Sequence, residues 1–320
     1  MIRVLPIGSF LKESPFFKAS ERMTLQSYGI TLVSDELVAD LIVAGVNPGY
    51  PVLPGRFTFR RLLPLMLKYG NAKKYLIWTD EPRYDSHFTS FVQYPFLPKV
   101  HIFNVFTGAY INNYRWLPAL KLQPLKDFEF KHRRVVALMG YRDKRRELTL
   151  KYRGKELDLN RLRIAVALEG HALGLVDIYG QGWPEGITLG ESRKGDWRQN
   201  KLDILQGYHF NLAFENTNWP YYCTEKIWDA VQAGCLPIYS GQGNAIYEDF
   251  PSDSFIDFCK FGNSSNLYSF IQSMTSQEFR RRINLCIDAF NAAVKKQEEK
   301  AGGWKELAVL TAQRIHEIIE

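Results

Sequence analysis

One short connection, ENTNWPYYCTEK, runs from Glu215 to Lys226 and contains two acids, a lysine, two tyrosines and two asparagines. The segment before it, YHFNLAF, predicts a strand, and TEKIWDAVQAG predicts a helix with Thr224 as N-cap and Gly234 as its end. The free N–H groups and dipole of a helix start favour an anion. A mobile Lys226 side chain at this end would favour the same ligand, and a diphosphate fits both features.

Glu225, beside Lys226, can accept hydrogen bonds from two vicinal sugar hydroxyls. The spacing of these residues therefore agrees with a site for a diphosphate and for sugar hydroxyls. A polar loop with a TEK helix start also occurs in proteins that bind no ligand, so the spacing alone leaves both interpretations open.

The N-terminal part of the chain predicts an alternation of strands and helices. Strands are expected at MIRVLPI, TLVSD, ADLIVAG, KKYLIW and KVHIFNVF. Helices are expected at SDELVAD and FRRLLPLMLKYG, the latter with Pro64 near its first turn. A polar connection, LQPLKDFEFKHRR, precedes a new strand, RVVALMG, which places a domain boundary near residue 130.

The second half continues the same alternation, with a helix at RLRIAVALEGHALG and strands at LVDIYG and CLPIYSG. This order predicts a mostly parallel sheet covered on both faces. The expected architecture is therefore α/β, with two Rossmann-like domains, residues 1–130 and 131–320, facing a cleft. The tail from about Ser276 is helical by periodicity, with a break at Gly302 and Gly303, and is expected to pack on the second domain.

Composition excludes several classes of protein. No apolar run approaches the roughly 18 residues of a membrane-spanning helix, and the first residues lack the continuous apolar segment of a signal peptide. The four cysteines and six histidines have no metal-ligand or disulfide-framework spacing. The net charge of +7 is spread along the chain and interrupted by acids, so it does not predict nucleic-acid binding.

One long segment resembles a known family. FNLAFENTNWPYYCTEKIWDAVQAGCLPIYSG, followed by YEDFPSDSFIDF, is similar to the donor-binding signature of the α-1,3/4-fucosyltransferases, glycosyltransferase family ten. Over about fifty residues, this segment has the parts of the family's pattern in the family's order, namely FEN, a tyrosine, TEK, a helix, AG and a proline-containing strand. The resemblance implies a GT-B fold and an inverting transfer of fucose from GDP-fucose to a hydroxyl of an acceptor glycan, with α-1,3 linkage to GlcNAc or a similar sugar.

The resemblance also nominates donor-binding residues. Glu225 is expected on the ribose and Lys226 on the diphosphate, and Asn216 and Tyr222 are expected to line the donor. An arginine ahead of VDIYG is expected on the diphosphate, and Arg161 is the preferred candidate. Because an extra basic segment, YRDKRRELTLKYRGKELDLN, precedes this helix, two further arginines stay open as alternatives, namely Arg163 and Arg146.

Catalysis by inversion needs a general base and positive charge for the departing diphosphate. The strand KKYLIW ends in TDEP, and the family carries its candidate base in a matching segment. Glu81 is therefore the predicted base and Asp80 the reserve, although a strand-end acid can also be only a turn former. The chain has no D-x-D triplet, so no metal ion or other cofactor is expected to be required.

Two alternative functions keep the same site. The residues that would hold diphosphate and ribose do not identify the sugar, so another GDP-sugar is one alternative. The other is a catalytically silent nucleotide-sugar-binding protein. A nucleotide-cofactor oxidoreductase is disfavoured because neither half begins with the glycine fingerprint of such enzymes. The expected location is cytoplasmic, either free or peripheral to a membrane, and the acceptor and oligomeric state are not predicted.

Overall fold

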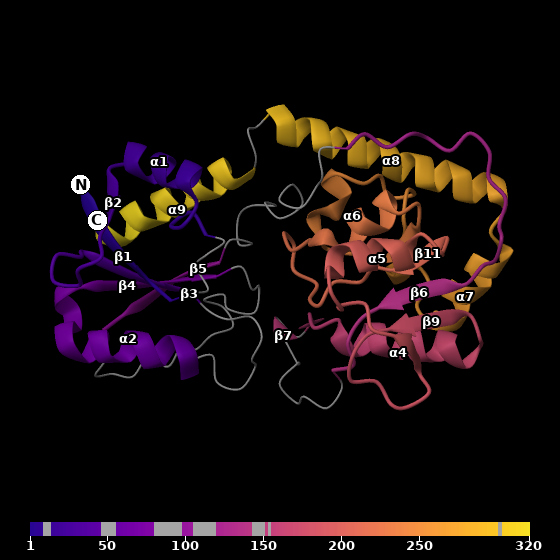
Figure 1. Cartoon of the computed structure of the whole chain (residues 1–320), viewed down its shortest axis with the longest axis horizontal. Coiled ribbons are helices and arrows are strands. Elements are labelled where there is room, and N and C mark those ends of the chain that lie inside the picture. The colour runs from indigo at the N-terminus through magenta and orange to yellow at the C-terminus, as the bar shows by residue number, and fades with distance from the viewer. Residues whose placement is uncertain are drawn as a thin grey trace. The chain divides into compact units, whose positions relative to one another are not determined.

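The computed structural model describes residues 1–8, 14–45, 56–79, 98–104, 120–142, 151–152, 155–299 and 303–320, and Figure 1 shows the whole chain. The chain divides into two compact units. The first comprises residues 1–111, 152–155 and 300–320, and the second comprises residues 112–151 and 156–299. Among the described residues, no helix is long and apolar enough to cross a membrane.

The first unit is built on a five-stranded sheet of order β2-β1-β3-β4-β5, in which all neighbours are parallel. Its strands are β1 (Ile2–Ile7), β2 (Ile30–Leu32), β3 (Leu41–Gly45), β4 (Lys74–Thr79) and β5 (Val100–Asn104). Strand β3 reads LIVAG, and all five of its residues are buried. A continuous apolar strand of this kind is typical of a parallel sheet that is covered on both faces.

Helices cover the two faces of this sheet. They are α1 (Ala19–Ser27), α2 (Arg56–Tyr69), which continues into the 3₁₀ turn η2 (Gly70–Ala72), and α9 (Gly303–Ile319). Figure 1 shows α2 on one side of the strands and α1 with α9 on the other. Leu62 and Met66 of α2 pack in a buried cluster with Ile42 and Tyr75 of the sheet.

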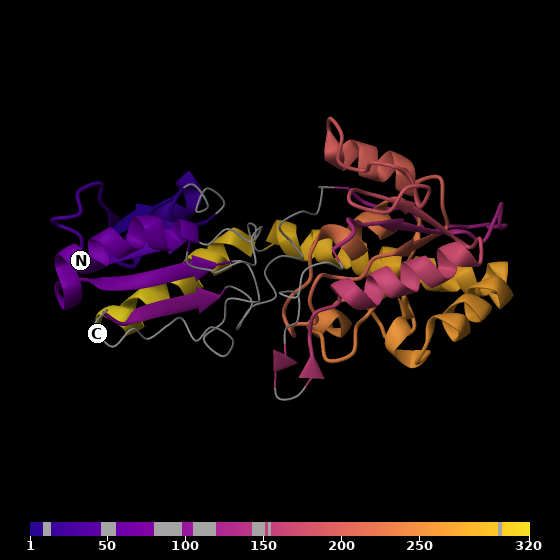
Figure 2. The same ribbon diagram turned by 90° about the horizontal axis from the view of Figure 1, so that it is seen from below.

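Helix α9 is fixed to the first unit by polar contacts as well as by packing. The indole N–H of Trp78 donates to Thr311 Oγ1 at 3.2 Å, and both groups are buried. The ammonium group of Lys74 donates to the carbonyl of Ile319 at 3.0 Å, at the end of α9. In Figure 2 the yellow C-terminal helix lies against the purple strands of this unit.

The second unit contains a six-stranded sheet of order β10-β9-β6-β11-β12-β13, again parallel throughout. Its strands are β6 (Val135–Leu138), β9 (Val176–Tyr179), β10 (Thr188–Gly190), β11 (Phe210–Leu212), β12 (Leu236–Tyr239) and β13 (Ile256–Asp257). Its helices are α4 (Asn160–Ala172), α5 (Trp197–Leu205), α6 (Glu225–Gln232), α7 (Ser264–Ser273) and α8 (Ser276–Glu299), with 3₁₀ turns η5 (Ala245–Glu248) and η6 (Phe258–Lys260). A separate two-stranded sheet pairs β7 (Lys151–Tyr152) with β8 (Lys155–Glu156).

The segment before β6 is attached to helix α8. The side-chain amide of Asn291 accepts from the backbone N–H of Leu122 and donates to its carbonyl, at 2.8 and 2.9 Å. Asn284 makes the same pair of bonds to Leu125, at 2.8 and 3.0 Å. Two asparagines on α8 thus satisfy backbone groups that no strand partner satisfies, and they hold this segment in the second unit.

The prediction of two Rossmann-like α/β domains is confirmed, because both sheets are parallel and carry helices. The division of the chain differs from the predicted 1–130 and 131–320 in two respects. The second unit begins at Asn112, and Leu122 and Leu125, which precede residue 130, are bonded to α8 of that unit. The C-terminal helix belongs to the first unit, because Thr311 and the end of α9 contact Trp78 and Lys74 of β4.

Three local predictions in the first unit were wrong or incomplete. SDELVAD is a turn and not a helix, since Asp35 Oδ1 accepts from the N–H of Leu37 at 2.8 Å and Leu37 is exposed. Pro64 lies well inside α2, which begins at Arg56. Helix α1 was not predicted, because few of its residues are apolar and only Glu21 and Leu25 are buried.

We expect Thr311→Val to lower the free energy of unfolding by about 1–2 kcal/mol, because the buried indole N–H of Trp78 would lose its acceptor. Urea unfolding of the purified protein measures this difference. Thr311→Ser keeps the hydroxyl and serves as the matched control, since it retains the hydrogen bond and loses only a methyl group. A Thr311→Val variant as stable as the wild type would show that this contact does not hold α9.

Candidate functional site

The polar connection leads into helix α6 at the carboxyl edge of the second sheet. Thr224 occupies the N-cap position, as predicted, with an extended backbone conformation. Its hydroxyl, however, makes no capping bond to the first turn. Gly234, which follows the last turn, has a φ of 81°, a conformation that favours glycine. The predicted limits of the helix are therefore confirmed, while the hydroxyl of Thr224 has another partner.

That partner is Glu215, whose side chain is almost completely buried, with 1% of the residue exposed. Its carboxylate accepts from the backbone N–H of Thr224 at 2.7 Å and from the hydroxyl at 2.9 and 2.8 Å. It also accepts from Lys226 Nζ at 2.9 Å. A buried carboxylate is stable only when it is paired and hydrogen-bonded, and Glu215 meets both conditions at the start of α6.

Lys226 is held in place and is not the mobile charge that the sequence predicted. Its ammonium group donates to Glu215 Oε2 and, at 2.6 Å, to Thr224 Oγ1, and it lies 3.8 Å from a carboxylate oxygen of Glu225. Burial alone would lower the pKa of Lys226, but the charges of Glu215 and Glu225 outweigh burial and raise it. Lys226 is therefore a fixed cation at neutral pH.

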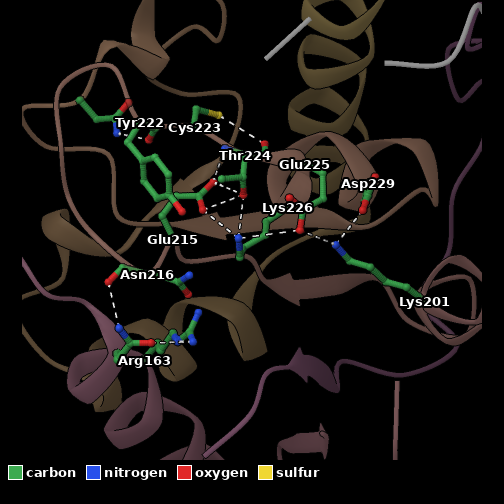
Figure 3. Close-up of polar contacts among 12 residues, drawn as sticks. Arg163, Lys201, Glu215, Asn216, Tyr222, Cys223, Thr224, Glu225, Lys226 and Asp229 are labelled. Carbon is green, nitrogen blue, oxygen red and sulfur yellow. Dashed lines mark hydrogen bonds and ion pairs between the residues drawn. The ribbon is translucent and has the colours of Figure 1, made fainter. Parts of the chain in front are cut away.

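Glu225 lies between two lysines. Its Oε1 is 3.4 Å from the ammonium group of Lys201 on α5, which also pairs with Asp229 at 2.6 Å. Burial raises the pKa of Glu225, but the charges of Lys226 and Lys201 dominate and hold it well below its usual range. Figure 3 shows Lys226 directed at Glu215 and Thr224, and Lys201 approaching Glu225 and Asp229.

A pocket opens at this edge of the second sheet. Backbone and side chains at the ends of β6 and β11, together with residues from α4, α5, α6 and the loop after β10, form its walls. The charged residues that line it are Arg163, Arg193, Lys201, Lys226 and Glu225. Even when Glu215 and Asp229, the partners of Lys226 and Lys201, are counted with Glu225, positive charge is in excess, so the pocket is suited to an anion. Among the described residues, no cluster of three or more histidines, cysteines or acids could hold a metal ion.

Arg163 lines this pocket, whereas the preferred candidate, Arg161, does not. Arg161 is an exposed residue on the first turn of α4. Arg163 is 5% exposed, and its NH2 group donates to Asn160 Oδ1 at 2.8 Å. Its Nε is buried and has no hydrogen-bond partner among the described residues. Burial, together with the charge of Arg142, lowers the pKa of Arg163 to about 10, so the guanidinium is charged at neutral pH.

The remaining predicted residues have different positions relative to the pocket. Glu225 and Lys226 line it. Asn216 and Tyr222 are close to it in the same connection but are not among its lining residues. The backbone carbonyl of Asn216 accepts from the N–H of Leu159 at 3.0 Å. Glu81, Asp80 and Arg146 lie outside the described residues.

Sequence reasoning missed several residues of the site. Trp197 and Lys201 line the pocket from α5, a helix that the sequence analysis did not predict, and Arg193 lines it from the preceding loop. Glu215 was noted only as part of FEN. The sequence offers one signal for α5, because Asp196 caps its first turn through bonds to the N–H groups of Arg198 and Gln199.

We expect Glu215→Gln to lower the free energy of unfolding by about 2 kcal/mol or more, because Lys226 would lose its closest counter-charge in a buried setting. Urea unfolding at neutral pH measures the change. Glu185→Gln, at an exposed glutamate, is the matched control and should stay within about 0.5 kcal/mol of the wild type. Equal stabilities of the two variants would contradict a structural role for this carboxylate.

Comparison with solved structures finds an α1,3-fucosyltransferase crystallised with GDP-fucose. The TM-score is 0.49 at 17% sequence identity, over 92% of this chain and 89% of that one. Among curated proteins, the chain is 32% identical over 127 residues to a 3-galactosyl-N-acetylglucosaminide 4-α-L-fucosyltransferase of Pan troglodytes. It is 39% identical over 82 residues to α-(1,3)-fucosyltransferase 7 of Bos taurus.

These two alignments cover 39% and 25% of this chain, and 31% and 24% of the relatives. The chain therefore matches about a third or less of the length of these relatives. A family model described as glycosyltransferase family 10 (fucosyltransferase), C-terminal, matches residues 144–282, which include the whole polar connection and helix α6. The predicted resemblance is confirmed, and residues 144–282 are similar to the C-terminal domain of glycosyltransferase family 10.

Proposed function

We propose that the chain is an inverting fucosyltransferase that moves fucose from GDP-fucose to a hydroxyl of an acceptor glycan, with α-1,3 linkage to GlcNAc or a similar sugar. The observation that carries this proposal is the cationic pocket formed mostly by family-matched residues, which Arg163, Lys226 and Glu225 line together. The relatives that are named as fucosyltransferases support fucose as the transferred sugar.

In this proposal the diphosphate occupies the part of the pocket between Arg163 and Lys226. The buried Nε of Arg163 is a donor without a protein acceptor among the described residues, and a phosphate oxygen would satisfy it. Glu225 is ionised and can accept bonds from the ribose hydroxyls. Asn216 and Tyr222 stay predicted donor contacts from the neighbouring loop.

The same cations would assist departure of GDP. Negative charge grows on the diphosphate as the bond to fucose breaks, and fixed positive charge in a partly buried pocket stabilises that state. Arg163 and Lys226 supply the charge without rearrangement, since protein partners already hold each of them. We therefore include in the proposal that transfer requires no metal ion and no other cofactor.

Glu81 is the proposed general base, with Asp80 as the reserve. A glutamate at this position would take the proton of the acceptor hydroxyl as its oxygen attacks the anomeric carbon and GDP leaves. The predicted cytoplasmic location also stays a prediction.

We expect Arg163→Ala to weaken GDP binding at least about tenfold, because a buried charge-assisted hydrogen bond is worth about 1.5–3 kcal/mol. Isothermal titration calorimetry with GDP, GDP-fucose, GDP-mannose and UDP-galactose measures the affinities. Arg161→Ala, two residues away on the exposed side of α4, is the matched control and should bind GDP like the wild type. If Arg161→Ala weakens GDP binding and Arg163→Ala does not, Arg161 is the residue that binds the diphosphate. A wild-type protein that binds no GDP species would exclude the proposed donor.

We expect Glu81→Gln to lower the transfer rate by about a hundredfold or more while leaving GDP-fucose affinity within about twofold, because a general base contributes to the reaction and not to donor binding. Transfer of radiolabelled fucose to a panel of GlcNAc-containing acceptors, with EDTA present, measures the rate. Asp80→Asn is the neighbouring control and should retain most activity. If Asp80→Asn is the inactive variant, the base is Asp80, and loss of wild-type activity in EDTA would contradict metal independence.

A further inference from the structure

The side chain of Asn160 connects two residues of the site without lining the pocket itself. Asn160 is 2% exposed and begins helix α4. Its Oδ1 accepts from Arg163 NH2 at 2.8 Å. Its Nδ2 donates to Asp158 Oδ2 at 2.9 Å and to the backbone carbonyl of Asn216 at 3.2 Å. Both polar atoms of the Asn160 side chain therefore have hydrogen-bond partners in the protein.

The orientation of this amide is determined by its partners. Two acceptors, the carboxylate of Asp158 and the carbonyl of Asn216, face Nδ2, while a donor, the guanidinium of Arg163, faces Oδ1. Turning the amide over would place NH₂ against a guanidinium, which has no acceptor, and oxygen against two oxygens. Asp158 is itself fixed, since its Oδ1 accepts from the backbone N–H of Asn160 at 2.8 Å.

The choice of an amide has a consequence for charge. A carboxylate in this position would hold the guanidinium equally well but would neutralise much of its charge toward a ligand. An amide oxygen orients one NH2 group of Arg163 without adding a negative charge to those of Glu215 and Asp158, which already act on the guanidinium. The buried Nε, which has no described partner, then remains as a donor for a ligand.

We propose that Asn160 is a positioning residue for the donor diphosphate, which holds the guanidinium of Arg163 in the orientation that binds phosphate oxygens while preserving its charge. This inference rests on the proposed function, because it assigns the diphosphate to Arg163. It goes beyond that function in giving a role to a residue that would not touch the donor.

A double-mutant cycle tests the proposal on the full chain by calorimetry with GDP. We expect Asn160→Ala to weaken GDP binding about tenfold in the wild-type background, as for a lost hydrogen bond to a charged group, and by less than twofold in the Arg163→Ala background. Guanosine, which lacks phosphate, should bind the wild type and Asn160→Ala equally. Leu173→Ala, at an exposed residue after the same helix, is the control for general effects on α4.

Three results would overturn the proposal: unchanged GDP affinity in Asn160→Ala, an equal loss in both backgrounds, or a parallel loss of guanosine binding, which indicates a general distortion of the loop. If Asn160→Ala does not fold, Asn160→Leu, which has the same number and branching of side-chain heavy atoms and no acceptor, replaces it in the same cycle. Binding that depends on Arg163 but not on Asn160 refutes only the positioning role, whereas a wild-type chain that binds no GDP refutes the proposed function itself.

Discussion

The buried carboxylate of Glu215 is the interaction on which the site depends. It lies at the end of the strand segment that carries β11, and it binds the backbone and hydroxyl of Thr224 and the ammonium group of Lys226. One side chain therefore fixes the N-cap of α6 and the first cation of the pocket. Because this carboxylate is removed from water, each of these bonds is stronger than it would be on the surface, and loss of Lys226 would leave a buried charge without its counter-charge.

Two other cations of the site are also held by polar partners within the protein. Lys201 is held by Asp229 and Glu225, and Arg163 is held by the amide oxygen of Asn160. Carboxylates compensate the two lysines, whereas a neutral group orients the arginine. The pocket thus combines rigid cations with an excess of positive charge, which is the electrostatic requirement for binding a diphosphate and for stabilising it as a leaving group.

The parallel sheet explains why these residues meet. The chain leaves β6, β10 and β11 at the same edge, so the loops after these strands and the starts of α5 and α6 gather there. Residues separated by more than sixty positions, such as Arg163 and Lys226, thereby line one pocket.

The sequence by itself determined the type of fold and the position of the loop that we propose binds the donor. Apolar runs of strand length, such as LIVAG and CLPIYSG, alternate with amphipathic helices, and this local pattern is sufficient for two parallel sheets. FEN and TEK, with Glu225 and Lys226, could be predicted to bind the donor from the order of the motif along the chain. These features are encoded locally, in the spacing of residues within one segment.

Only the tertiary structure decided which arginine lines the pocket, what holds Lys226, and which unit receives the last helix. Arg161 and Arg163 are two positions apart on α4, so they face different directions, and their burial depends on what packs against each face. The attachment of α9 depends on Trp78 and Lys74, more than 200 residues away along the chain. Contacts of this separation leave no periodic signal in the sequence, because either partner alone is an ordinary residue of its own helix or strand.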